Sequence, residues 1–393
     1  MKILYITQLF PFPADSGGKI KSYQTLQLLS QENDIYLICF SDSALEASYL
    51  KKVKDFCKSV QVVYRPEVTR RFKEIPLMII KSIFSLKPFE ILRYSSSQVT
   101  DYIFELLQRE DIEAIHIDHL NMAQYLPKNK SQKWVLEEHN IESNLLKQAY
   151  KVSRFPLKIF YLWESIKFWL FEKKYWNKFD EILAISYIDK KNIVSRGINE
   201  KKIVVFPPVL KPNNRFSPKN KKVILFAGFL SWWPNSEGVY WFYDNVFHLI
   251  KKKVSKVEFW LVGKQATDRM KEIAKKDSKV KLLGYVRNIG EIYKKVLVLV
   301  VPIKGGSGIR MKILDGLSAG LPVVSTFFGV SGIDVIDGEE VLLADKPDKF
   351  ADKVIRILTN KKLADQLSVK VLKFVADNYS EKKALQVLSL VYY

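Results

Sequence analysis

The sequence predicts an α/β protein of two Rossmann-like, doubly wound domains that face each other across a cleft. Three observations support this prediction. The chain has 393 residues, which is too long for a single ordinary hydrophobic core. Short β-rich runs alternate with amphipathic helical stretches, which is typical of parallel sheets covered by helices. The alternation stops at a Pro-, Asn- and Lys-rich segment, residues 207–222, and then starts again.

The first half contains a series of predicted strands separated by helical stretches such as KIKSYQTLQLLSQ and DYIFELLQRE. The strands are expected at Ile3–Thr7, Asp34–Phe40, Val60–Tyr64, Ala114–Asp118, Lys133–Glu138, Glu181–Ser186 and Ile203–Phe206. We therefore assign residues 1–206 to an N-terminal domain and residues 207–222 to a linker.

The second half repeats the pattern with the strand-like runs KVILFAG, VEFWLVG, VKLLGYV, VLVLVVPI and PVVST. We assign residues 223–375 to a C-terminal domain. The last segment, residues 376–393, contains a helix that can pack back on the N-terminal domain. Ligands of such sheets bind beyond the carboxyl ends of the strands.

Composition narrows the class of protein. Two cysteines, Cys39 and Cys57, are too few for a disulfide framework and fit a reduced cytoplasmic protein. The start MKILYIT does not resemble an export signal, and no window approaches the ~20 apolar residues of a membrane-spanning helix. The formal charge of +21 favours anionic partners, which are nucleic acid, anionic lipid or phosphorylated substrates, without choosing among them.

The sharpest local signal is PIKGGSGIRMKILDGLSAGLPVVST, residues 302–326. Gly305, Gly306 and Gly308 form a tight turn after an apolar strand, and a helix begins near Ile309 and ends at Gly320. A glycine turn at a helix N-terminus directs backbone N–H groups at one point, which suits a diphosphate. The alternative is a plain glycine turn before a solvated helix.

Charged residues follow this turn. Arg310 and Lys312 can add charge-assisted hydrogen bonds to a phosphate. Asp315, one helical turn further on, can accept hydrogen bonds from two ribose hydroxyls. The sequence has no Asp-x-Asp motif and no Cys/His cluster, so we expect no metal and no other cofactor.

This stretch resembles the donor-site signature of retaining GT-B glycosyltransferases of the GT4 type. That signature is a Glu, seven residues, a second Glu, and a small-residue helix ending in Gly before a Pro-Val-Val strand. Asp315 lies at the second Glu position and Ser307 at the first. LFAGFLSWWPNSEGVYWFYDNV, FWLVG and LLGYV resemble one branch of this family, in which a Trp-x-Pro-Asn element replaces an Arg and Lys clamp. The resemblance therefore implies that Arg310 and Lys312 contact the diphosphate.

The N-terminal half resembles the same branch. FPFPADSGGKIKSYQ carries a glycine pair that lets the backbone approach the transferred sugar, and WVLEEHNIESNLL carries a histidine that faces the cleft and the donor sugar. The resemblance implies a catalytic set of His139, Gly18, Arg310 and Lys312. It implies a donor-binding set of Gly17, Gly228, Gly263, Tyr285, Val286, Gly305, Gly306, Ser307, Gly308, Ile309 and Asp315.

Two further histidines lie in AIHIDHL. His116 and His119 are three apart on a strand and should point to opposite faces, so a shared zinc site is not expected. His119, at the strand end, could line the acceptor side.

An aromatic and basic segment, residues 155–179, resembles an interfacial helix, with aromatics for the headgroup boundary and lysines for anionic lipid. The residues expected on the membrane or acceptor side are Lys158, Trp163, Lys167, Trp169, Lys173 and Lys174, together with His119. The alternative is a helix that packs on the N-terminal sheet while its lysines are only solvated.

These observations predict a metal-independent, hexosyltransferase-type enzyme at the cytoplasmic face of the membrane. It would move a sugar from a UDP- or GDP-sugar to a hydroxyl of a lipid-linked or surface-polysaccharide acceptor. The resemblance to GT4-type enzymes implies that the transfer proceeds with retention. Another GT-B enzyme, such as a nucleotide-sugar epimerase or a phosphorylase, and a non-catalytic nucleotide-sugar or polyanion-binding protein are the alternatives. Nucleic acid is not an expected partner, because no recognised binding motif occurs.

Overall fold

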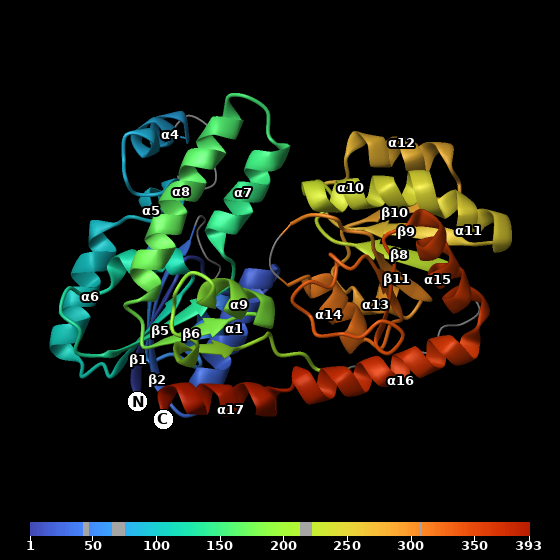
Figure 1. Ribbon diagram of the computed structural model, residues 1–393. Helices are drawn as coiled ribbons and strands as arrows, with labels where there is room; N and C mark the ends of the chain where they lie inside the picture. The colour runs from blue at the N-terminus through green and yellow to red at the C-terminus, as the bar shows by residue number, and fades with distance from the viewer. Residues whose placement is uncertain (42–46, 65–74, 213–221, 307–308) are drawn as a thin grey trace. The chain divides into compact units, whose positions relative to one another are not determined.

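The computed structural model describes residues 1–41, 47–64, 75–212, 222–306 and 309–393. The chain forms two compact units (Figure 1). Unit 1 comprises Met1–Val209 together with Ala384–Tyr393, and unit 2 comprises Leu210–Lys383. Among the described residues, unit 1 holds a seven-stranded sheet and unit 2 a six-stranded sheet. The prediction of two doubly wound α/β domains is therefore confirmed.

The sheet of unit 1 has the order β3-β2-β1-β4-β5-β6-β7, with every neighbouring pair parallel. Its strands are β1 (Lys2–Thr7), β2 (Asp34–Ser41), β3 (Ser59–Tyr64), β4 (Ala114–Asp118), β5 (Lys133–Glu138), β6 (Glu181–Ala184) and β7 (Ile203–Val205). All the strands predicted in this half are present. β6 ends before Ser186, because the Ser186 side chain caps the next helix by accepting a hydrogen bond from the Asp189 backbone N–H.

Helices cover both faces of this sheet. They are α1 (Gly17–Leu29), α2 (Ala47–Lys54), α4 (Ile75–Ile83), α5 (Phe89–Arg93), α6 (Ser97–Arg109), α7 (Glu142–Val152), α8 (Leu157–Trp176), α9 (Tyr187–Val194) and α17 (Glu381–Tyr392), with 3-10 turns η1 (Leu120–Tyr125) and η2 (Glu200–Lys202). Helices α7 and α8 lie side by side (Figure 1). In β1, Leu4 and Ile6 enter one core cluster and Ile3 and Tyr5 enter the other. Both faces are buried, which explains why the strands are continuous apolar runs.

The C-terminal helix α17 belongs to the core of unit 1. Ala384, Leu388, Val391 and Tyr392 are buried in the same cluster as Ile3. The preceding helix α16 belongs to unit 2. The chain therefore passes between the units twice, near residue 209 and near residue 383.

The sheet of unit 2 has the order β10-β9-β8-β11-β12-β13 and is parallel throughout. Its strands are β8 (Val223–Ala227), β9 (Glu258–Val262), β10 (Val280–Gly284), β11 (Val298–Val301), β12 (Val323–Ser325) and β13 (Val341–Leu343). Its helices are α10 (Trp233–Phe242), α11 (His248–Lys253), α12 (Asp268–Lys276), α13 (Gly290–Tyr293), α14 (Met311–Ser318), α15 (Pro347–Thr359) and α16 (Lys361–Asn378), with the π-turn η3 (Tyr243–Phe247). Apolar clusters line both faces of this sheet.

Each sheet has one point where the strand order reverses. In unit 1 it lies between β1 and β4, and in unit 2 between β8 and β11. In doubly wound sheets, the connections on the two sides of such a point run to opposite faces, and ligands bind there beyond the carboxyl ends of the strands. These two switch points are where a ligand site is expected.

Within the part of the chain that the structure describes, we find no helix with the length and apolar character needed to cross a bilayer.

Candidate active site

The switch point of unit 2 carries the predicted glycine turn. β11 ends at Val301, and Gly305 and Gly306 follow it. The predicted residues Ser307 and Gly308 lie outside the described residues. Helix α14 begins at Met311 rather than near Ile309, because Arg310 has a non-helical backbone with φ −84° and ψ 89°. Beyond the helix, Gly320 has φ 70°, a left-handed conformation that stops it as predicted.

Glycines are sterically required at the ends of β8 and β9. A Cβ atom on Gly263 would lie 1.7 Å from the carbonyl oxygen of Gly228, and one on Gly228 would lie 2.8 Å from Nζ of Lys312. In the glycine turn, a Cβ on Gly305 would lie 2.5 Å from the Trp233 ring. The Trp-Trp-Pro-Asn element and the glycine turn therefore pack directly against each other.

Lys312 lies in a desolvated position. Its Nζ donates a 2.6 Å hydrogen bond to Oδ1 of Asn235 and lies 4.4 Å from the Phe226 ring centroid. Burial, with a contribution from Arg310, lowers the pKa of Lys312 to about 7. Arg310 is itself 5% exposed, and its guanidinium lies 4.9 Å from the Phe328 ring centroid. Two cationic side chains thus lie close together at the start of α14.

The remaining predicted donor residues lie in the same unit. Asp315 lies in the middle of α14, where burial raises its pKa to about 6. Tyr285 follows β10 and is exposed, with Nζ of Lys264 4.5 Å from its ring centroid. Val286 is partly buried against the core of unit 2. The structure describes these positions, and their roles in donor binding stay predictions.

The switch point of unit 1 brings three predicted residues together: Gly18, His119 and His139. Helix α1 begins at Gly17, and a Cβ on Gly18 would lie 3.6 Å from Nε2 of His119. His119 follows β4 directly and has a left-handed backbone with φ 72°. His139 follows β5 directly, and its ring stacks on that of His119 with centroids 3.8 Å apart.

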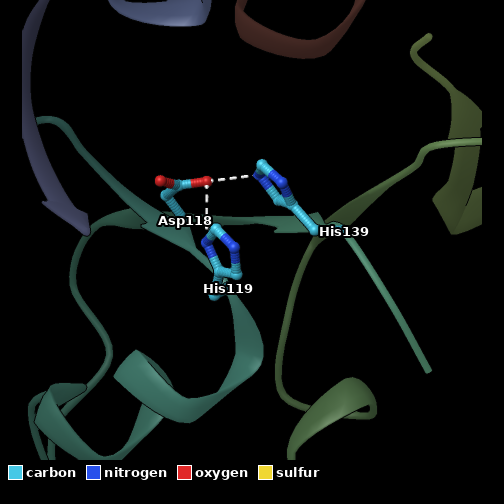
Figure 2. A group of neighbouring side chains, drawn as sticks. All are labelled: Asp118, His119 and His139. Atoms are coloured by element: carbon cyan, nitrogen blue, oxygen red, sulfur yellow. Dashed lines mark hydrogen bonds and ion pairs between the residues drawn. The ribbon is translucent and has the colours of Figure 1, made fainter. Parts of the chain in front are cut away.

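Asp118, the last residue of β4, connects this group (Figure 2). Its Oδ1 accepts a 2.6 Å hydrogen bond from Nε2 of His139 and lies 3.3 Å from Nδ1 of His119. Its Oδ2 accepts hydrogen bonds from the hydroxyls of Thr7, at 2.5 Å, and Ser22, at 2.6 Å. Asp118 has no exposed surface, so these contacts replace the water that an ionised carboxylate needs.

A second buried carboxylate, Glu137, lies beside this group. Its Oε1 lies 3.1 Å from Nζ of Lys21, and its Oε2 lies 3.2 Å from Nε2 of His116. The other nitrogen of His116, Nδ1, lies 2.6 Å from the hydroxyl of Tyr392 in α17. His116 and His119 thus have different partners. The buried polar network extends from α1 through the sheet to the C-terminal helix.

The charged groups in this network shift one another's pKa values. Burial alone would raise the pKa of both carboxyls, but the imidazoles hold the pKa of Asp118 well below its usual range. Lys21 is the chief group that lowers the pKa of Glu137, to about 2. Although burial opposes it, Asp118 raises the pKa of His119. Burial, assisted by His119, lowers the pKa of His139.

The donor atoms of Asp118, His119 and His139 all lie within 4.8 Å of one another, which is close enough for a metal ion. A cluster of this kind was not anticipated from the sequence. The two rings are nearly parallel, however, with an interplanar angle of 18°. Stacked rings in separate planes cannot both aim an in-plane lone pair at one ion. The arrangement therefore fits hydrogen bonding better than coordination, and we keep the expectation of no metal.

The predicted membrane-side residues of α8 divide into two groups. Lys158, Trp163, Lys173 and Lys174 are exposed, and Trp169 is half-buried. The prediction for Lys167 is wrong, because Lys167 is buried and ion-paired with Glu164. Its Nζ also donates to the carbonyl oxygen of Ser82 at 2.8 Å. Lys167 therefore joins α8 to the end of α4 and does not face the solvent.

Sequence reasoning missed Asp118, Glu137 and Lys21. The available signal was an acidic residue inside an otherwise apolar strand, in AIHID and in WVLEE. Such residues are rarely buried unless they are paired, so they point to partners elsewhere in the chain.

The sequence is similar to known proteins. Residues 221–360 match the family described as glycosyl transferases group 1. Across the full length, the chain is 24% identical to an uncharacterized 44.6 kDa protein in the cps region of Klebsiella pneumoniae, with 97% of each chain covered.

Solved structures show the same fold. Anabaena HepE in complex with UDP superposes with a TM-score of 0.67 at 13% identity, over 99% of each chain. A Staphylococcus aureus TarM variant in complex with fondaparinux, α-GlcNAc-glycerol and UDP gives a TM-score of 0.70 at 12% identity, over 100% of each chain. At these identities the similarity establishes the GT-B fold and does not assign a substrate.

Proposed function

With residues 221–360 assigned to the group 1 glycosyl transferases, we propose that this protein transfers a sugar from a UDP- or GDP-sugar to a hydroxyl group. Unit 2 binds the nucleotide diphosphate at its switch point. The observation that carries this proposal is the pair of cations at the N-terminus of α14, where Arg310 is buried and Lys312 is half-buried with a pKa lowered by desolvation. Burying a cation costs free energy that an anionic ligand returns.

In the proposed reaction, the bond between the sugar C1 and the diphosphate oxygen breaks, and a bond from C1 to the acceptor oxygen forms with retention. The nucleoside diphosphate leaves with the electron pair. Arg310 and Lys312 stabilise the charge that develops on it, as prearranged cations do in desolvated sites. Asp315 holds the ribose, and Tyr285 and Val286 lie near the base. Gly18, His119 and His139 of unit 1 bind the reacting sugars.

The proposed acceptor is a lipid-linked or growing surface polysaccharide. Two comparisons support this class: the relative in a cps region, and the TarM structure with glycan ligands. An apolar and basic surface of unit 1 supports it independently.

Unit 1 exposes large apolar side chains along α4, α8 and the segment after α4. Phe84 and Leu86 are each 88% exposed, and Phe155 is 79% exposed. We call this the α4–α8 surface; it comprises Ile80, Ile83, Phe84, Leu86, Phe155, Leu157, Ile159, Leu162, Trp163, Ile166 and Leu170. Exposed lysines accompany it at 81, 87, 158, 173 and 174. Apolar groups flanked by cations suit the interface of an anionic bilayer, so we propose peripheral binding to the cytoplasmic face of the membrane.

The donor proposal is tested with a panel of UDP-glucose, UDP-galactose, UDP-N-acetylglucosamine and GDP-mannose. A true donor at one hundred times its Kd adds about 2.7 kcal/mol of stability, seen as a rise in Tm. Turnover is then measured with a crude lipid acceptor extract. Binding with no turnover would favour a non-catalytic nucleotide-sugar protein, and no binding by any donor would exclude the proposal.

The membrane proposal is tested by cosedimentation with vesicles of phosphatidylcholine alone or with phosphatidylglycerol. Binding should require the anionic lipid. The double variant Phe84→Ser/Leu86→Ser should bind at least tenfold more weakly, since each side chain loses about 1.5–3 kcal/mol of apolar burial. Phe104→Ser is the matched control, because Phe104 is 63% exposed on α6, outside the surface. Equal effects of the two variants would contradict the proposal.

A further inference from the structure

The buried contacts of Asp118 restrict where hydrogen atoms can lie in the site of unit 1. An ionised carboxylate only accepts hydrogen bonds, so Thr7, Ser22 and His139 must all donate to Asp118. The hydrogen shared with His139 is therefore on Nε2 of that ring. A neutral imidazole carries one hydrogen, so its second nitrogen, Nδ1, is left with a lone pair.

We propose that Asp118 is a positioning residue that fixes the tautomer and orientation of His139, so that Nδ1 of His139 accepts a hydrogen bond from a hydroxyl of a sugar substrate. This inference rests on the proposed function and adds a chemical requirement to it. A nitrogen that only accepts cannot bind a phosphate oxygen, which also only accepts. The group that His139 recognises is therefore an O–H of the sugars and not the diphosphate.

The surroundings of His139 keep its ring neutral. It is 4% exposed, and the stacked His119 competes for the same carboxylate from 3.3 Å. Burial and this neighbour lower the pKa of His139, whereas the pKa of His119 is raised by Asp118. A proton entering the pair is therefore held by His119. His139 stays an acceptor at neutral pH.

Asp118 is held firmly enough for this task. Thr7 lies at the end of β1, Ser22 lies on α1, and both hydroxyls bond the carboxylate oxygen opposite the one that meets His139. The same helix α1 begins at the predicted sugar-binding pair Gly17 and Gly18. The carboxylate is thus fixed from two elements, and rotation that would release His139 would break two hydrogen bonds.

The tautomer can be observed directly. The chain has only four histidines, so the protein labelled with ¹⁵N-histidine gives few ring signals, and His139→Ala identifies those of His139. In the wild type we expect a protonated Nε2 and an unprotonated Nδ1 on His139. In Asp118→Asn we expect a mixture of tautomers, since an amide can also donate. A protonated Nδ1 in the wild-type protein at neutral pH would overturn the inference without any variant.

Kinetics provide the second readout. Asp118→Asn should lower kcat by about 10- to 100-fold, the range for loss of an outer partner that orients a histidine, while the Kd of UDP changes by less than about threefold. The double variant Asp118→Asn/His139→Ala should be no slower than His139→Ala alone, because both act through one group. Independent, multiplicative losses would contradict the proposal.

Tyr392→Phe is the matched control. It removes a 2.6 Å hydrogen bond to His116 in the same buried network but leaves the contact between Asp118 and His139 in place. It should keep kcat and the tautomer of His139. If Asp118→Asn retains wild-type kcat while His139→Ala loses it, the inference fails and the proposed function stands. If the wild type neither binds nor turns over any donor, the proposed function fails, and the NMR result still tests the tautomer.

Discussion

The two switch points differ in the sign of their charged side chains and in the groups that surround them. In unit 1, the carboxylates of Asp118 and Glu137 are met by hydroxyls, imidazoles and Lys21 from neighbouring elements. In unit 2, Lys312 donates to the neutral amide of Asn235 and lies near a second cation. In the first site opposite charges and hydrogen-bond donors face the carboxylates, whereas in the second a bound anion would relieve the repulsion between Lys312 and Arg310. This difference agrees with the proposed function, which assigns sugar hydroxyl groups to unit 1 and the diphosphate to unit 2.

The largest expected effect is the loss of stability when a glycine at a crowded backbone position is replaced by alanine. Gly263→Ala in unit 2 should destabilise by more than about 4 kcal/mol, because the new Cβ would lie 1.7 Å from the carbonyl oxygen of Gly228 at φ 149°. Gly197→Ala in unit 1 is the control. Gly197 has φ 89° and no atom within 4 Å of the added Cβ, so only about 1 kcal/mol of strain is expected. Urea unfolding measures both, and equal losses would show that the close approach of the two strand ends is wrong.

Acid should affect the contributions of Glu137 in unit 1 and Asp315 in unit 2 with opposite sign. The folded pKa of Glu137 is lowered from 4.5 to about 2, so its contribution is complete above pH 4.5 and is lost as the pH falls towards 2. The shift corresponds to about 3 kcal/mol. Glu137→Gln should remove this dependence, whereas Glu32→Gln, at an exposed position, should not.

In unit 2 the carboxyl of Asp315 behaves in reverse. Burial raises its pKa from 3.8 to about 6, so without ligand the contribution of this carboxyl to stability should increase as the pH falls from 7 towards 4, and Asp315→Asn should remove that increase. Hydrogen exchange measured by mass spectrometry at several pH values reports each unit separately. If Glu137→Gln and Asp315→Asn changed the pH profiles of their units in the same direction, the electrostatic contrast between the two residues would be wrong.

Donor binding tests the cationic side of the comparison. Lys312→Ala should weaken UDP binding by about 2–3 kcal/mol, roughly 30- to 150-fold, the usual range for a hydrogen bond to a charged group. Lys271→Ala is the control, because Lys271 lies exposed on α12 and pairs with Asp268. Calorimetric titration measures both. If Lys312→Ala binds UDP as the wild type does, the donor site has been misplaced.

The smallest effect is the pH dependence of that affinity. The pKa of Lys312 is lowered to about 7 in the protein without ligand, and a bound diphosphate should raise it. UDP binding should therefore take up a proton, and the affinity should fall about fivefold between pH 7 and pH 8. Titrations in buffers of different ionisation enthalpy detect the proton, and Lys312→Met should abolish its uptake. Proton release in the wild type would contradict the assignment.

The fold could be predicted well because buried parallel strands are continuous apolar runs, and both sheets show them. The start of α14 was placed too early because the backbone of Arg310 depends on the packing of the glycine turn and not on local sequence. Lys167 was misassigned since the pattern of α8 does not reveal that α4 covers one side of it.

The network around Asp118 could not be predicted from the sequence for a related reason. Its partners come from distant parts of the chain: Thr7 and Ser22 lie about a hundred residues before Asp118, and Tyr392 near the end of the chain reaches His116. Only the sheet order, with β1 beside β4 and β4 beside β5, brings them together. Local motifs singled out His119 and His139, whereas the residues that contact them follow from the order of the strands in the sheet.

The burial of α17 has a bearing on biosynthesis. One face of the first sheet is completed by Ala384, Leu388 and Val391, which a ribosome makes only after the whole of residues 210–383. A nascent chain therefore keeps that face uncovered while the second half emerges and folds. Expressed alone, residues 1–209 should be prone to aggregation, and a synthetic peptide of residues 381–393 added in trans should restore their solubility.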